Sequence, residues 1–141
     1  MLMISILPFS PEDYEDAMAL WKDSPGIGLS QADSLEAITE FLERNPGLNW
    51  VAKLNKQLVG TLLCGYDGRR AYLYHLAVHP EYRRQGIGRA LVERCLERLK
   101  EMRVEKAHLF VYADNQEAVA FWKATGWYPR PELIIMSFNV S

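Results

Sequence analysis

The stretch from Leu76 to Arg89 restricts the possible folds more than any other part of the sequence. An apolar run ends at a loop that contains a proline, and two glycines separated by one residue then open a long amphipathic pattern. The residues of this stretch are Leu76-Ala77-Val78-His79-Pro80-Glu81-Tyr82-Arg83-Arg84-Gln85-Gly86-Ile87-Gly88-Arg89. This order predicts a strand, a short loop and a helix whose N-terminus is free of side chains at Gly86 and Gly88.

A helix N-terminus of this kind suits a small anion. The first backbone N–H groups of a helix have no partner within the helix, and the helix dipole adds partial positive charge there. Arg83, Arg84 and Arg89 flank the glycines and can add charge-assisted hydrogen bonds. We therefore expect the loop and the first helical turn to bind a compact anionic group such as a pyrophosphate.

Other nucleotide, metal and nucleophile motifs do not fit the sequence. A dinucleotide-binding fold needs a third glycine three residues after the second, and position 91 is Leu91; a P-loop needs Gly-Lys-Ser/Thr, which does not follow. Cys64 and Cys95 lie far apart among apolar residues, so we expect buried free thiols. The histidines lack ligand spacing, and we expect no metal site.

Hydrophobic periodicity and turn residues predict an α/β chain with a mixed sheet and the element order β-α-α-β-β-β-α-β-α-β-β. The expected strands are Met3–Leu7, Asn49–Leu54, Gln57–Tyr66, Arg70–Val78, Lys106–Tyr112, Trp127–Arg130 and Leu133–Val140. Helices are expected to begin after Ser10, at Asp33 or Ser34, at Gly86 and after Asn115. A crossover helix between the fourth and fifth strands makes those two strands parallel, with helices on both faces of the sheet.

Composition narrows the class of protein further. The chain has 141 residues, of which 49% are hydrophobic, and this suits a single domain spanning residues 1–141. A formal net charge of -2 argues against a broad nucleic-acid surface. No signal peptide and no apolar run long enough to cross a bilayer is present, so we expect a cytoplasmic protein with no membrane partner.

Two motifs together resemble those of a known family. Arg83-x-x-Gly86-x-Gly88, after Leu76-Ala77-Val78-x-Pro80, is similar to the acyl-CoA signature of the GNAT superfamily of N-acetyltransferases. The later block, from Asn115 through Ala118-Val119-Ala120-Phe121-Trp122 to Gly126-Trp127, is similar to the family's second motif. The segments Gly60-Thr61 and Gly65-Tyr66-Asp67-Gly68 resemble small bacterial YpeA-like members. The resemblance covers nearly the whole chain.

The resemblance implies a cofactor site for acetyl-CoA as cosubstrate. The strand that ends at Val78 and the strand Lys106–Tyr112 would splay apart and admit the pantetheine arm. Backbone N–H groups of Leu76 and Val78 would bond the arm, one of them facing the thioester oxygen. The residues implied as cofactor-binding are Leu76, Ala77, Val78, Arg83, Arg84, Gln85, Gly86, Ile87, Gly88, Arg89 and Asn115.

The resemblance further implies direct attack of an acceptor amine on the thioester. An amine with a pKa of about 10.4 must first lose a proton, so a base or a water chain is needed. Tyr72 and Tyr74 share a strand face towards the splay and are the candidate catalytic residues, each able to order a water. His75 is expected on the opposite face, as a packed or surface residue, and His79 in solvent. Glu36 and Glu40 are further candidates on the acceptor side.

One position departs from the family pattern. Many members have a Tyr where this chain has Trp122, and that phenol is taken to protonate the leaving thiolate. An indole donates a hydrogen bond but is no acid here. Three interpretations follow: no acid is needed, Tyr112 or Tyr128 replaces it, or catalysis is weak. We expect Trp122 to pack beside Phe121 and Trp127.

The sequence is compatible with two alternatives to an active acetyltransferase. The chain is either an acetyltransferase, a catalytically silent acyl-CoA-binding regulatory module on the same fold, or a protein-interaction domain without cofactor. The acceptor amine is a small molecule, a protein N-terminus or a lysine, and the sequence does not choose between them. The apolar strand Leu133–Val140 is an edge that favours pairing in a homodimer.

Overall fold

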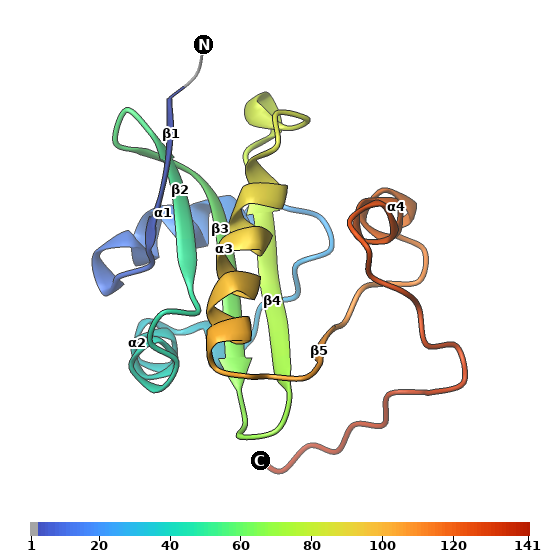
Figure 1. Ribbon diagram of the computed structural model, residues 1–141. Coiled ribbons are helices and arrows are strands. Elements are labelled where there is room, and N and C mark those ends of the chain that lie inside the picture. Colours follow the sequence, from blue (N-terminus) through green and yellow to red (C-terminus); the bar gives the residue numbers. More distant parts are fainter. Residues whose placement is uncertain (1–2) are drawn as a thin grey trace. The chain divides into compact units, whose positions relative to one another are not determined.

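The computed structural model describes residues 3–141, which form two units with the boundary in the chain after Phe110 (Figure 1). A single domain over residues 1–141 stays a prediction. Residues 3–110 contain the elements β1 (Ile4–Pro8), η1 (Pro11–Asp13), α1 (Tyr14–Lys22), η2 (Gln31–Asp33), α2 (Leu35–Arg44), β2 (Trp50–Leu54), β3 (Gln57–Tyr66), β4 (Ala71–Val78), η3 (Pro80–Tyr82), α3 (Ile87–Glu101) and β5 (Ala107–Leu109). Residues 111–141 contain α4 (Gln116–Ala124).

Five strands form one mixed sheet in the order β1-β2-β3-β4-β5. The first three pairings are antiparallel, and β4 pairs with β5 in parallel. A parallel pair needs a crossover connection, which α3 supplies. Asn55 and Lys56 turn β2 into β3 with φ of 49° and 72°, as a two-residue type I′ hairpin requires. The expected α/β class and the expected meander of β2, β3 and β4 are confirmed.

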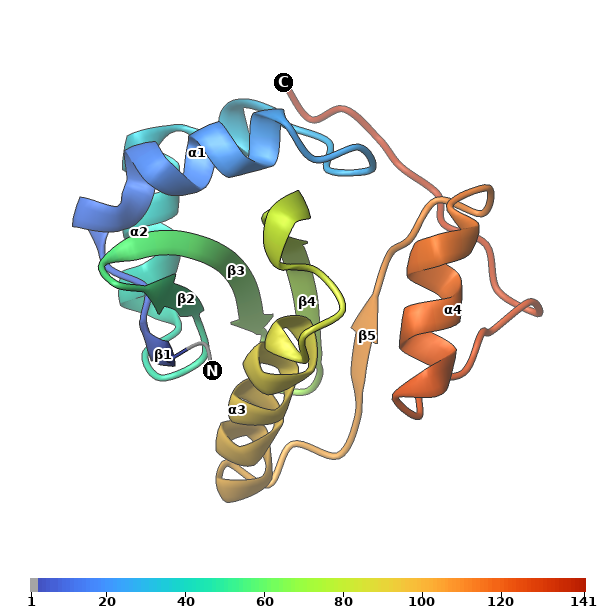
Figure 2. The ribbon, with the colours of Figure 1, turned by 90° about the horizontal axis from the view of Figure 1, so that it is seen from above.

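Helices cover both faces of the sheet (Figure 2). Contacts of neighbouring residues in β3 show which helix lies on which face. Thr61 accepts a hydrogen bond from the indole N–H of Trp21 in α1, at 2.9 Å. A Cβ on Gly60 would lie 3.1 Å from Leu91 and 3.3 Å from Ile87, both in α3. Because successive side chains of a strand point to opposite faces, α1 and α3 lie on opposite sides of the sheet. Gly65 lies on the same face of β3 as Thr61. A Cβ on Gly65 would lie 3.0 Å from Phe41 of α2, so α2 packs on the face that α1 covers.

Short polar side chains start the helices where the sequence predicts. The Ser34 hydroxyl accepts the backbone N–H of Ala37 at 3.1 Å and caps α2. The chain after Ser10 differs slightly from expectation, because its first turn is the 3-10 helix η1. The carboxylate of Asp13 accepts the Ser10 N–H at 3.0 Å and closes that turn, so α1 begins only at Tyr14.

The unit of residues 111–141 contains one helix. Asn115 caps α4 by accepting the N–H of Ala118 at 3.1 Å. Gly126, at a φ of 99°, ends it: the N–H groups of Gly126 and Trp127 donate to the carbonyls of Lys123 and Trp122 at 3.1 and 3.0 Å. These two backbone hydrogen bonds form a Schellman motif, and they confirm Gly126 as the predicted end of the helix.

Two strand predictions for this unit are wrong. Trp127–Arg130 and Leu133–Val140 were expected as strands, and the structure has none between residues 127 and 141. A strand is stable only when a neighbour satisfies its backbone groups, and alternating apolar residues alone do not supply that neighbour. The large apolar side chains of this segment are exposed, among them Ile134, Met136 and Phe138.

The burial of the two cysteines decides their role. Cys64 and Cys95 are free and buried, as predicted. A hydrogen bond to Cys64 and burial raise the pKa of the Cys95 thiol, so it is a packing residue and no nucleophile. In the part of the chain that is described, no helix has both the length and the apolar character to span a bilayer.

Candidate active site

A β-bulge interrupts β4 just before the residues expected to bind the cofactor. Leu63 of β3 lies opposite Tyr74, but Thr61 lies opposite Ala77, so β4 has one residue more than β3 over this interval. His75 lies in the bulge with a φ of 51°, a left-handed conformation that costs a non-glycine residue about 1–3 kcal/mol.

The bulge makes the expected orientation of His75 wrong. Its ring packs on Trp21 of α1 and its Nε2 lies 2.7 Å from the carboxylate of Asp33. Tyr74 contacts Phe41 of α2, so both side chains face the side of the sheet that α1 and α2 cover. Strict alternation would place them on opposite faces, and the extra residue cancels it. The expectation that His75 is packed holds.

The bulge also changes which edge of β4 carries which amides. The N–H of Ala71 donates towards β5, to Lys106 O at 3.4 Å, whereas the N–H of His79 donates towards β3, to Val59 O at 2.8 Å. Alternate amides of a regular strand point to one edge, so positions 71 and 79 would agree without the bulge. Ala77 has the parity of His79 and faces β3. Leu76 and Val78 therefore direct their amides to the edge on the β5 side.

That edge is open beyond the first part of β4. The parallel register joins Ala71, Tyr72 and Leu73 to Ala107, His108 and Leu109, and β5 ends there. Within the described residues of the sheet, Leu76 and Val78 thus have no β5 partner. β5 is shorter than the expected strand Lys106–Tyr112, and this early end is what opens the edge. An extended chain or an amide-bearing arm fits such an edge as an added strand.

The loop after β4 leads to a helix N-terminus without a side-chain cap. Gly86 is the N-cap of α3 at a φ of 81°, no side chain bonds the first turn, and that turn has no acidic residue. Helices α2 and α4 differ, since Ser34 and Asn115 cap them with their side chains, whereas α1 also lacks a side-chain cap. The bare amides at Ile87, Gly88 and Arg89 are therefore free of competition from the protein's own oxygens.

The basic residues of the loop are exposed and one of them is fixed. The Arg83 Nε donates to the carbonyl of Val78 at 3.1 Å, which joins the loop to the end of β4. Arg84 has a φ of 63°, and its side chain is exposed, as are those of Gln85 and Arg89. The left-handed conformations at positions 84 and 86 alternate along the loop, a geometry that turns successive amides inward around an anion.

Two of the expected cofactor residues serve the core with their side chains. Ala77 is buried in the cluster that contains Trp21 and Ile38. Ile87 is buried and packs over Gly60. Only the amide of Ile87 can therefore reach a ligand, and Ala77 spaces Leu76 and Val78 apart.

The two candidate catalytic tyrosines lie on one face, as expected. The Tyr72 ring stacks on Phe110 with centroids 6.1 Å apart and contacts His108 at 5.7 Å. Tyr74 is half-exposed, and burial, followed by the nearby Tyr72, raises the pKa of its phenol. A raised pKa keeps this phenol protonated near neutrality, so it can order a water but is a poor base.

The remaining candidates have simpler environments. Glu36 and Glu40 lie exposed on α2. The Nδ1 of His79 accepts the N–H of Glu81 at 3.2 Å and starts η3. In residues 3–141 no group of three or more His, Cys, Asp or Glu could hold a metal ion.

In the unit of residues 111–141, the second motif forms the helix and its aromatic cluster. Asn115 uses its side-chain oxygen as the α4 cap. Trp122 packs edge-on between Phe121 and Trp127, each 5.1 Å away between ring centroids, as expected for a packing residue. Tyr112 and Tyr128 are exposed.

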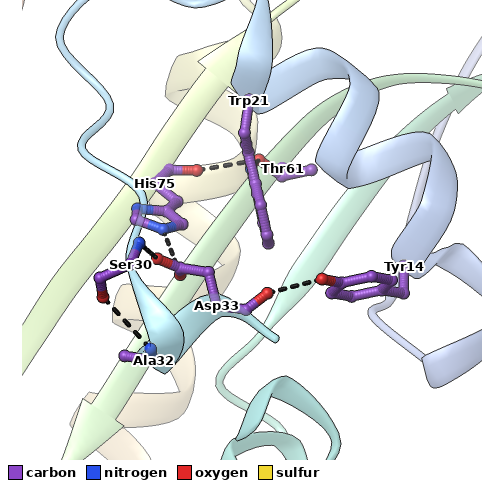
Figure 3. Close-up of polar contacts among 7 residues, drawn as sticks. All are labelled: Tyr14, Trp21, Ser30, Ala32, Asp33, Thr61 and His75. Carbon is purple, nitrogen blue, oxygen red and sulfur yellow. Dashed lines mark hydrogen bonds and ion pairs between the residues drawn. The ribbon is translucent and has the colours of Figure 1, made fainter. Parts of the chain in front are cut away.

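Sequence reasoning missed the polar groups around His75 (Figure 3). Asp33, Thr61 and Trp21 surround it with hydrogen bonds and a ring contact. The Ser30-x-x-Asp33 spacing is a capping-box pattern and signals a helical turn at Asp33. No sequence signal indicates that this carboxylate also reaches β4.

The chain is similar in sequence and in fold to known proteins of one family. A family model described as Acetyltransferase (GNAT) family matches residues 14–127. An acetyltransferase of Pectobacterium atrosepticum is 32% identical over 115 residues, which cover 82% of this chain and 81% of the relative. An acetyltransferase of Photorhabdus laumondii is 34% identical over 120 residues, with 82% and 80% covered.

Solved structures share the fold. Ard1 from Thermoplasma volcanium superposes with a TM-score of 0.78 and 27% identity, over 87% of this chain and 81% of that one. The PaiA N-acetyltransferase from Thermoplasma acidophilum, solved in complex with coenzyme A, superposes with a TM-score of 0.80 and 22% identity, over 89% of each chain.

Fold and relatives together define the class of enzyme, an N-acetyltransferase that depends on acetyl-CoA. The chain belongs to the acetyltransferase (GNAT) family. The expected family and fold class are thereby confirmed, and the interpretation as a cofactor-free interaction domain is abandoned.

Proposed function

We propose that this protein transfers an acetyl group from acetyl-CoA to a primary amine by direct attack, at the open edge of β4. One observation carries the proposal: the bulge directs the amides of Leu76 and Val78 to an edge that β5 leaves free, beside the uncapped N-terminus of α3. An acyl-CoA has an amide-bearing arm for such an edge and a pyrophosphate for such a helix end.

The pyrophosphate lies against the loop and first turn of α3. Backbone N–H groups from Arg84 through Arg89 face it, and the glycines at 86 and 88 allow close approach. Arg84 and Arg89 add charge, whereas Arg83 also holds the loop to β4 through the Val78 carbonyl. Asn115 caps α4, and its contact with the arm stays a prediction from the family resemblance.

The bound thioester supplies an activated acetyl group. The neutral amine forms an N–C bond to the carbonyl carbon, the C–S bond breaks, and coenzyme A leaves as a thiolate. An amide of Leu76 or Val78 stabilises the negative charge that develops on the carbonyl oxygen. The proton released by the nitrogen passes through water ordered by Tyr72 or Tyr74.

The thiolate leaves without an acid from position 122. A thiol has a pKa of about 8.5, so its thiolate is a tolerable leaving group at neutral pH. Trp122 packs in an aromatic cluster and supplies no proton. The same observation favours the second candidate function, a silent acyl-CoA-binding module. Release of free thiol from acetyl-CoA with a panel of amines separates the two.

The acceptor and the setting of the reaction are further parts of the proposal. We propose a small amine, a protein N-terminus or a lysine as acceptor, in the cytoplasm. A homodimer through Leu133–Val140 has lost its basis, because that segment forms no strand. Proteins of similar structure include a ribosomal-protein-S18-alanine N-acetyltransferase of Escherichia coli and an aminoglycoside acetyltransferase. One fold thus serves several acceptors and does not choose one here.

Gly88→Asp tests the site directly. Position 88 is the second residue of α3, where a carboxylate stabilises the helix through its dipole but repels a pyrophosphate. We expect at least a hundredfold loss of coenzyme A affinity by calorimetry, with an unchanged or higher melting temperature. Gly28→Asp, at an exposed glycine between α1 and η2 that has no positive φ, is the matched control and should bind normally. Equal affinity in Gly88→Asp and the unsubstituted protein would reject the site.

A further inference from the structure

His75 adopts a backbone conformation that its own chemistry disfavours. Its φ of 51° is left-handed, and residues in that region persist only where the surroundings determine them. The parity change at Leu76 and Val78 depends on this one residue, because the extra position of β4 falls between Tyr74 and Ala77. Whatever holds His75 therefore also holds the direction of those two amides.

Contacts fix His75 at its carbonyl and at its ring. The Thr61 hydroxyl donates to the carbonyl of His75 at 2.8 Å and accepts the indole N–H of Trp21 at 2.9 Å. The imidazole Nε2 lies 2.7 Å from Asp33 Oδ1, and the ring meets the edge of Trp21 with centroids 4.7 Å apart. Figure 3 shows the carbonyl and the ring of His75 held from different elements.

Asp33 is itself held in place. Its Oδ2 accepts the N–H of Ser30 at 3.0 Å, and its carbonyl accepts the Tyr14 hydroxyl at 2.6 Å. The residue is buried, and its side chain is only 9% exposed. A buried carboxylate with both oxygens engaged is an anchor for the imidazole, because neither oxygen can turn away without losing a partner.

We infer that Asp33 and His75 are positioning residues for acetyl transfer: they fix the β4 bulge and so aim the amides of Leu76 and Val78 at the donor. The inference rests on the proposed function, since those amides are the ones assigned to the donor there. It assigns no proton transfer to His75, whose Nε2 is bonded to Asp33. The contact between Asp33 and His75 also links η2, in the connection between α1 and α2, to β4, against which the donor is proposed to bind.

Substitutions at position 75 separate backbone from side chain. Asn tolerates left-handed backbone by itself, although its shorter amide does not reach Asp33 as the imidazole Nε2 does. Val is β-branched and disfavours a positive φ. We expect His75→Asn to bind coenzyme A within threefold of the unsubstituted protein, and His75→Val to bind at least tenfold more weakly. Kd is measured by calorimetry, after circular dichroism has established that each variant is folded.

Asp33→Ala removes the anchor and leaves position 75 unchanged. We expect at least a tenfold weaker Kd for coenzyme A, and this variant carries the test if His75→Val does not fold. Glu43→Ala, an exposed acid near the C-terminal end of α2, is the matched control and should bind normally. The pH profile of kcat in His75→Asn, followed by thiol release with spermidine as the probe amine, should keep its shape.

Each result has a distinct meaning. Failure of the unsubstituted protein to bind coenzyme A overturns the proposed function and this inference with it. Normal binding by the unsubstituted protein and equally by His75→Val and Asp33→Ala overturns the inference alone. A His75→Asn variant that keeps its affinity but loses turnover, together with one limb of the pH profile, identifies His75 as a proton acceptor and also overturns it.

Discussion

The environment of Tyr74 distinguishes a hydrogen-bonding role of its phenol from a role as a base. Its phenol is half-exposed beside Phe41, and burial and then Tyr72 raise its pKa above the ordinary value of 10.0. The pKa is raised because burial disfavours the ionised phenolate, so the phenol stays protonated throughout the neutral range. Its contribution to turnover is then a hydrogen bond to water or substrate.

We predict that Tyr74→Phe lowers kcat about tenfold, the value of one lost hydrogen bond, and leaves the pH profile unchanged between about pH 6 and pH 9. The measurement is kcat by thiol release across that range. Tyr66→Phe, at the end of β3, is the control and should be neutral. Disappearance of an alkaline or acid limb in Tyr74→Phe would mean that the phenol titrates during catalysis.

At the scale of elements, the turn between β3 and β4 depends on one carboxylate. Asp67 Oδ1 accepts the N–H groups of Arg69 and Arg70 at 2.7 and 2.8 Å. These two bonds, Arg70 first, lower the pKa of Asp67 below its usual 3.8. A depressed pKa in the folded state means that the charged form stabilises the fold above the unfolded pKa, and that this stabilisation is lost as pH falls through the folded value.

We predict that Asp67→Asn is less stable than the unsubstituted protein at neutral pH, and that the difference shrinks as pH falls below about 4. Asn keeps an oxygen for the turn, so the comparison isolates the charge. Urea unfolding at a series of pH values measures it. A gap that is constant from neutral to acid pH would show that the charge plays no part.

The elements also show how far sequence patterns reach. Ser34, Asn115 and Gly126 set helix ends through bonds within a few residues, so local patterns predicted them. The bulge at His75 was not predictable, because the φ of one residue depends on Asp33 and Thr61, which are distant in sequence. The strand Leu133–Val140 failed because a strand needs a partner as well as apolar residues.

On the scale of the whole molecule, charge is divided along the chain. Residues 1–45 carry nine acidic and two basic side chains, whereas residues 46–141 carry nine acidic and fourteen basic ones. Seven of those basic residues follow the end of β4: Arg83, Arg84, Arg89, Arg94, Arg98, Lys100 and Arg103. Only Arg83, Arg84 and Arg89 of these lie at the uncapped end of α3, because positions 94 to 103 are further along the helix or at its other end. A net charge of -2 therefore conceals a local positive field that these three arginines make at the uncapped end.

This field predicts a dependence on salt that the fold itself does not share. Exposed charges are screened beyond a Debye length, which falls from about 10 Å at 0.1 M to about 3 Å at 1 M ionic strength. We expect the Kd for coenzyme A to rise about tenfold between low salt and about 0.5 M NaCl, because the phosphates meet exposed arginines. The thioester S-acetyl-N-acetylcysteamine is an acetyl donor without phosphate, and its turnover should be insensitive to salt. If coenzyme A binding were equally insensitive, the arginines would lie away from the phosphates, and backbone amides alone would account for the affinity.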